Sequence, residues 1–193
     1  MKNRLVLVCF GLLASFAAAQ NSNNPNSSNA SDSKSSLGST LKLIQDQVNK
    51  QGEIRFTMTS KNTASGETVQ DKYVVETSNA VADASSCSLQ VNARMVLNSI
   101  TQAQGTPVVS IRNIDSVIVK SESQAIEEKT KQAGVKQWTG TISPESYIVQ
   151  AFQSGGLVGM FFFRDQETAN LVAKDISRVV ELCGGRKATF DAN

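Results

Sequence analysis

The first twenty residues of this chain constrain most strongly what the remainder can fold into. Residues 1–4 include the basic Lys2 and Arg4, residues 5–16 form an apolar run, and residues 17–19 are three alanines. This is the layout of a secretory signal peptide, because the run is shorter than the ~20 apolar residues that a membrane-spanning helix needs. We therefore expect residues 1–19 to be removed on export, which leaves the mature chain in an oxidising compartment, periplasmic or extracellular.

Residues 20–37 consist mainly of Asn and Ser. Such a stretch has almost nothing apolar to bury, so burial cannot offset the entropy lost on ordering it. We therefore expect a disordered Asn/Ser-rich leader over residues 20–37. Residues 38–185 have the length of one domain with a sizeable core, and residues 186–193 are expected to form a C-terminal tail.

The charge of the chain limits its partners. The formal net charge is +2, far from the strongly basic surface of nucleic-acid-binding proteins, so we expect no nucleic-acid partner. The long apolar run lies within the expected signal peptide, so we also expect no stable membrane insertion after cleavage.

Two cysteines, Cys87 and Cys183, remain once the signal peptide is removed. An even number of cysteines in an oxidising compartment predicts a disulfide bond between them. The alternative is two separate buried thiols, which behave as small apolar residues. Because the bond would close a long loop, chain entropy predicts that it stabilises the fold by about 4–5 kcal/mol.

Seven segments have the patterns of β-strands, either alternating apolar and polar residues or short apolar runs between turn signals. They are residues 53–60, 68–77, 86–96, 108–111, 117–119, 147–152 and 157–164. The alternation over residues 86–96 places Cys87 on the inward face of its strand. Gly155 and Gly156 supply the positive φ of a tight hairpin between the last two strands. The last strand is apolar on both faces, so it needs cover on both sides.

A long amphipathic helix is predicted over residues 166–183. Asp165 is a good N-cap, apolar residues recur every three or four positions, and Gly184 and Gly185 stand where a left-handed C-terminal cap is wanted. We expect this helix to cover one side of the apolar strand that precedes it.

Two other segments show weaker helical patterns. Residues 41–48 form a short amphipathic helix in this interpretation, with Ser39 or Thr40 as its cap. Residues 121–140 are too polar for a core, so we expect a mobile excursion in which residues 125–131 form a small helix.

Antiparallel strands followed by one closing C-terminal helix are the element order of the pleckstrin-homology-like (PH-like) barrel. Residues 160–173, MFFFRDQETANLVA, resemble the last strand and helix start of such domains, and residues 110–119, SIRNIDSVIV, resemble their middle strand–turn–strand. The chain thus resembles PH-like domains of exported bacterial proteins over residues 53–184. The resemblance implies an α+β fold, mainly antiparallel β, with about seven strands in a PH-like barrel or strongly bent sheet, closed by the C-terminal helix and preceded by a short N-terminal helix. An open sheet with two helices packed on it is the alternative.

Members of this family typically bind phosphoinositides, peptides or proteins. A phosphoinositide site would need a basic cluster in the first inter-strand loop, and residues 61–66 contain the single lysine Lys61. The resemblance therefore implies a scaffold for binding proteins or peptides, without a site for lipid headgroups.

The chain contains 0 histidines, which removes the commonest general base, the usual Ser-His-Asp and Cys-His arrangements and most zinc sites. No phosphate-binding GxxxxGK(S/T) motif occurs either. Two groups of carboxylates could be imagined as acid/base pairs, but carboxylates in polar strands and loops are usually solvated. They are Asp71 with Glu76, and Glu122 with Glu127 and Glu128. We therefore predict no enzyme, no catalytic residue, no cofactor and no metal site.

Two functions of different class remain. The first is a non-catalytic exported binding or scaffold module that recognises a protein or peptide partner through a strand edge or groove. The second is a carrier of a small apolar ligand, held in a cavity between sheet and helix that Phe56, Phe161 and Phe163 would line; the alternative for these three is simple core packing. Trp138 is a further candidate contact for a ligand or partner, or else a residue that packs its loop onto the sheet.

Overall fold

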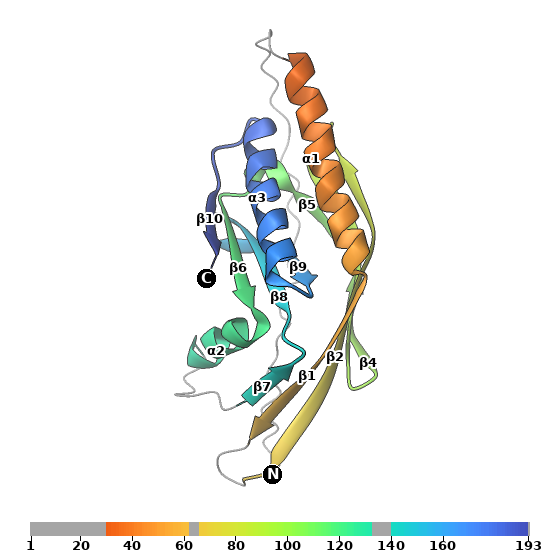
Figure 1. The fold of residues 1–193 in the computed structure, drawn as a ribbon, viewed down its shortest axis with the longest axis vertical. Helices are drawn as coiled ribbons and strands as arrows, with labels where there is room; N and C mark the ends of the chain where they lie inside the picture. The colour runs from red at the N-terminus through yellow and green to blue at the C-terminus, as the bar shows by residue number, and fades with distance from the viewer. Residues whose placement is uncertain (1–29, 62–65, 133–139, 193) are drawn as a thin grey trace.

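The computed structural model describes residues 30–61, 66–132 and 140–192 of the chain. Their secondary-structure elements are shown in Figure 1. In chain order they are α1 (Ala30–Gln51), β1 (Glu53–Lys61), β2 (Thr68–Asp83), β3 (Ser88–Leu97), β4 (Ile100–Gly105), β5 (Val108–Ser110), the 3-10 turn η1 (Ile111–Asn113), β6 (Ser116–Ser121), α2 (Glu122–Gln132), β7 (Gly140–Ser143), β8 (Tyr147–Gln153), β9 (Gly156–Phe163), α3 (Gln166–Leu182) and β10 (Thr189–Ala192). The expected signal peptide lies outside the described residues.

The strands form two sheets, and among the described residues neither sheet closes into a barrel. The larger sheet has the order β4-β3-β2-β1-β7, with β5 also paired to β3, and the smaller sheet has the order β10-β6-β8-β9. All pairings are antiparallel except that of β10 with β6. The predicted α+β class and its mainly antiparallel strands are confirmed. Of the predicted alternatives, a barrel or a strongly bent sheet, the barrel is wrong, and the described residues form ten strands instead of about seven.

Three strands, β4, β7 and β10, have no counterpart in the sequence pattern. Most of their residues are exposed, so they lack the apolar alternation that predicts a strand. Each lies at the edge of a sheet and is held by backbone hydrogen bonds to one neighbouring strand. Strand β10 lies within the residues expected to form the C-terminal tail.

The apolar strand β9 is covered on both faces, as its sequence predicts. Phe161 and Phe163 belong to one buried cluster, which α1 and α3 cover, while Phe162 belongs to a second cluster, against β1 and β2 of the larger sheet. The larger sheet contributes to both clusters, since Leu89, Val91 and Val109 also belong to the first. Two separate cores result, one on each face of β9.

Helix α3 begins and ends as its sequence predicts. The side chain of Asp165 accepts a hydrogen bond from the backbone N–H of Thr168 at 2.7 Å. At the other end, the N–H of Gly184, which has φ +74°, bonds to the carbonyl of Glu181 at 3.0 Å, and that of Gly185 bonds to the carbonyl of Val180 at 2.9 Å. This is a Schellman cap, and its positive φ favours glycine. The predicted apolar stripe is buried throughout.

Helix α1 is longer than predicted, because it begins at Ala30, within the stretch expected as a leader, instead of at residue 41. The predicted caps lie inside the helix: the hydroxyls of Ser39 and Thr40 donate to the carbonyl of Ser36, at 3.0 and 2.8 Å. Hydroxyl side chains inside a helix commonly bond back to the preceding turn in this way. The apolar stripe starts one turn earlier than expected, at Leu37, and packs against α3 and β2.

Candidate partner-binding groove

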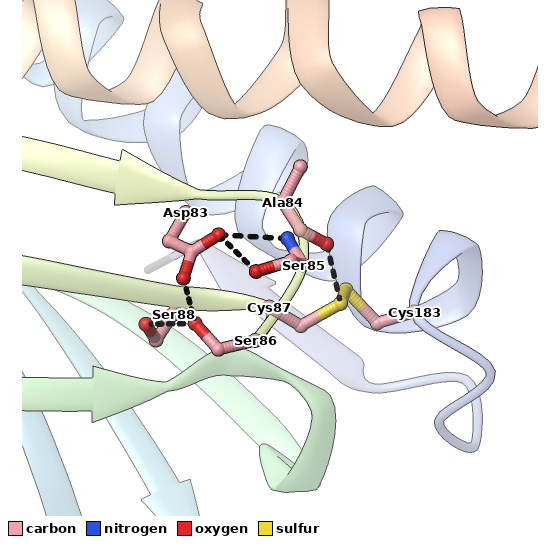
Figure 2. The surroundings of a disulfide bond; sticks show 7 residues. All are labelled: Asp83, Ala84, Ser85, Ser86, Cys87, Ser88 and Cys183. Carbon is pink, nitrogen blue, oxygen red and sulfur yellow. Dashed lines mark hydrogen bonds between the residues drawn. A yellow bond between two sulfur atoms is a disulfide. The ribbon is translucent and has the colours of Figure 1, made fainter.

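The predicted disulfide between Cys87 and Cys183 is confirmed, with a Cα–Cα distance of 6.1 Å. Figure 2 shows that it joins the turn between β2 and β3 to the end of α3. Cys87 lies in that turn, with φ +52°, and not on the strand where the alternation places it. Both cysteines are buried, so the bond fixes the C-terminal end of α3 to the larger sheet.

The turn that presents Cys87 is built around one carboxylate. Asp83 accepts hydrogen bonds from the backbone N–H of Ser85 at 2.8 Å, from the Ser85 hydroxyl at 2.6 Å and from the Ser86 hydroxyl at 2.7 Å (Figure 2). These bonds, chiefly that from the Ser85 side chain, lower the pKa of Asp83 to about 2. The turn is therefore ordered by local hydrogen bonds as well as by the disulfide.

A hollow of about 640 Å³ lies between α3 and the segment that leads into β10. Its helical wall consists of Lys174, Ser177, Arg178 and Glu181, which recur at three- and four-residue spacing and so share one face of α3. The opposite wall is formed by residues 187–190. We call this hollow the α3–β10 groove; Figure 1 shows the two elements, α3 and β10, that contribute its walls.

Cations predominate in the α3–β10 groove. Lys174, Arg178 and Lys187 line it together with a single carboxylate, that of Glu181. Within the described ranges, none of these three cations takes part in an ion pair. Arg178 donates one hydrogen bond, at 3.1 Å, to the hydroxyl of Ser36 in α1. Asp175, on the same helix, interacts electrostatically with Arg178, but among the described residues no carboxylate forms a direct ion pair with any of the three cations.

Glu122 differs most from its predicted environment. The structure buries its Oε2 atom without a hydrogen-bond partner among the described residues. Burial raises the pKa of Glu122 to about 7; Lys129 opposes the shift and the nearby carboxylate of Glu145 adds to it. The prediction of a solvated carboxylate is therefore wrong for this residue.

Glu122 lies in the first turn of α2, where the residue is partly buried and its Oε2 atom fully so. The backbone N–H of Ser121 donates to Gln124 at 2.8 Å, and the N–H of Gln124 donates to the Ser121 hydroxyl at 3.2 Å, which forms a reciprocal capping box. Ala125 and Ile126 follow and are buried in the second cluster. The predicted small helix is present, although it begins at Glu122 instead of residue 125. The prediction that this segment is too polar for the core is wrong, because α2 packs against β6 and β7 and buries Ala125 and Ile126. The S-x-x-Q pattern was the available sequence signal for its start.

The other carboxylates considered from the sequence each have a partner of their own. Asp71 accepts from Asn98 at 2.7 Å, Glu76 pairs with Arg94 at 3.3 Å, Glu127 pairs with Lys131 at 2.7 Å and Glu128 pairs with Lys120. Over the described ranges, no group of three or more His, Cys, Asp or Glu side chains is placed to hold a metal ion.

The structure separates Phe56 from the other two aromatic candidates, Phe161 and Phe163. Phe56 stacks on Tyr73 in the second cluster, with ring centroids 5.0 Å apart, whereas Phe161 and Phe163 are buried in the first cluster. Trp138 lies outside the described residues. Within these ranges no helix has both the length and the apolar character needed to cross a membrane.

Comparison with known proteins gives no match to this chain, either among protein-family models, among curated proteins or among solved structures. The resemblance to PH-like domains therefore stays a prediction. The candidate site is defined by geometry and charge alone.

Proposed function

We propose that this protein is a non-catalytic exported module that binds an acidic segment of a protein partner in the α3–β10 groove. The observation that carries the proposal is the set of three cations, Lys174, Arg178 and Lys187, which line a hollow without ion-pair partners in the described chain. Opposite charge across an interface selects partners and speeds their association. An acidic segment is therefore the partner chemistry that the groove favours.

Helix α3 is held in place at both ends, which favours binding without rearrangement of the groove. Its N-terminal end is capped by Asp165, its C-terminal end is fixed through Cys183, and its inner face is buried along its length. A wall that is already ordered loses little conformational entropy when a partner binds. The disulfide also suits a protein that works outside the reducing cytoplasm.

Charge reversal in the groove tests this function. The probe is a fluorescent peptide rich in glutamate, and its affinity is measured by fluorescence anisotropy for the oxidised protein and for the variant Lys174→Glu with Lys187→Glu. The matched control is Lys50→Glu with Lys72→Glu, which changes the net charge equally at exposed positions outside the groove. We expect the groove variant to bind about tenfold more weakly or worse and the control to bind like the parent protein. Equal weakening by both pairs would contradict a site in the groove.

A further inference from the structure

Strand β10 has one side that no other strand of the described residues occupies. It pairs in parallel with β6 and ends the order of the smaller sheet as far as the described residues extend. The backbone N–H of Thr189 donates to the carbonyl of Asp115 at 3.0 Å, so Thr189 directs its backbone groups toward β6. Because successive residues of a strand direct these groups to opposite sides, the N–H and C=O of Phe190 face the open edge. Such an edge is a template for pairing with another strand.

The side chains of β10 define which face of an added strand would meet the groove. Phe190 lies opposite Val117, which is fully buried in the cluster beneath α3. Phe190 packs against the same cluster, whereas Thr189 and Asp191 are exposed. A strand added beside β10 would continue this alternation, so every second side chain would point to the α3 side.

We propose that the partner segment binds in the α3–β10 groove by adding a strand to the open edge of β10, with acidic side chains at every second position directed toward α3. This inference rests on the proposed function and adds the mode of recognition and a sequence rule for the partner. Backbone hydrogen bonds to Phe190 would fix the register of the segment. Its alternate carboxylates would meet Lys174 and Arg178, which line the helical wall. Because β10 is short, both contributions are needed.

Methylation of the peptide backbone tests strand addition. The probe is a short peptide that alternates glutamate and threonine, compared with two isomers that carry N-methyl groups either on the glutamate amides or on the threonine amides. In an extended strand these two sets of amides face opposite edges. One set therefore faces β10: the glutamate amides if the added strand is antiparallel, or the threonine amides if it is parallel. We expect one isomer to bind at least about fivefold more weakly and the other to bind like the unmethylated peptide.

A variant of the protein gives a second readout. The N–H of Ala192 faces the open edge by the same alternation, so Ala192→Pro removes an outward donor while the hydrogen bonds from β10 to β6 remain. We expect Ala192→Pro to weaken binding of the unmethylated peptide by about threefold or more, and Ala192→Val, which keeps the N–H, to leave binding unchanged.

The outcomes separate the two proposals. Binding that responds to charge reversal at Lys174 and Lys187, but equally or not at all to the two methylation patterns, would overturn strand addition and leave the groove function standing. No binding of the unmethylated peptide would overturn both.

Discussion

The side-chain amide of Asn49 forms two hydrogen bonds with the backbone of Ala80, as donor to its carbonyl at 3.1 Å and as acceptor from its N–H at 2.8 Å. Ala80 lies where the pairing of β2 with β3 shifts register, between Ser78 and Val81. At such an irregularity the backbone loses ladder partners. Asn49 replaces them, and this connects α1 to the larger sheet.

Replacing Asn49 should therefore destabilise the fold. Asn49→Ala leaves the partly buried N–H and C=O of Ala80 without these partners, and we expect the free energy of unfolding to fall by about 1–3 kcal/mol. Urea unfolding followed by circular dichroism measures the change. The control is Asn92→Ala on the exposed face of β3, for which the change should stay within about 0.5 kcal/mol. Equal effects of the two substitutions would show that the contact with Ala80 adds no stability.

Gly185 marks a close approach between α3 and η1. A Cβ atom at this position would lie 2.3 Å from the carbonyl oxygen of Arg112 and 2.9 Å from that of Val180. We expect Gly185→Ala to lower the free energy of unfolding by about 1–3 kcal/mol, because both clashing atoms belong to the backbone and cannot move by a change of rotamer. Gly38→Ala is the control: its added Cβ meets nothing within 4 Å in helix α1, so a gain of up to about 1 kcal/mol is expected. A loss of stability in Gly38→Ala, or none in Gly185→Ala, would contradict this account.

Removing the disulfide should weaken the fold and the fixation of α3. We expect the double variant Cys87→Ser with Cys183→Ser to unfold with a free energy lower by about 2–5 kcal/mol, since the lost bond constrains a long loop of the unfolded chain. Thermal unfolding with and without reductant measures this. Reductant should bring the parent protein close to the variant and leave the variant unchanged. If reductant did not change the unfolding temperature of the parent protein, the disulfide would not be stabilising.

Glu122 should make stability depend on pH. Its pKa in the folded protein is about 7, against 4.5 for an ordinary glutamate, so the folded state binds more protons between these values. The contribution of Glu122 to the free energy of unfolding is thus fully present below about pH 4.5 and is lost as the pH rises through about 7. We expect Glu122→Gln to be more stable than the parent protein at pH 8, by about 1–3 kcal/mol, with the difference shrinking toward pH 5.

The matched control for this effect is Glu127→Gln on the same helix, at a largely exposed side chain. We expect urea unfolding of this variant to follow the pH dependence of the parent protein. If Glu122→Gln kept that pH dependence as well, Glu122 would not be the titrating group.

The parts of the fold that follow from the sequence are those whose burial repeats with a regular period. Helix α3 and strand β9 are examples, because their apolar residues mark the faces that become buried. Strands β4, β7 and β10 could not be predicted in this way, since backbone pairing at a sheet edge does not require an alternation of apolar and polar side chains. The sequence left a barrel and a strongly bent sheet as alternatives, because hairpin signals identify neighbouring strands but say nothing about how two sheets separate.

The candidate site depended on tertiary structure for similar reasons. Lys174 and Arg178 look like ordinary solvated helix residues in the sequence, and their shared groove arises only when β10 packs beside α3. The burial of Glu122 likewise follows from the docking of α2, whose apolar residues are few. The cysteine pair was predictable because its chemistry requires a partner and two cysteines remain in the expected mature chain.

Binding of an acidic peptide in the α3–β10 groove can be located on the protein by NMR. Amide chemical shifts of the oxidised protein are followed while a glutamate-rich peptide is added. We expect the largest changes to fall on residues 174–181 and 187–190, the two walls of the α3–β10 groove. Changes concentrated elsewhere, such as at the hollow formed by residues 59–61 with Thr68 and Thr141, or spread evenly over all exposed lysines, would contradict it.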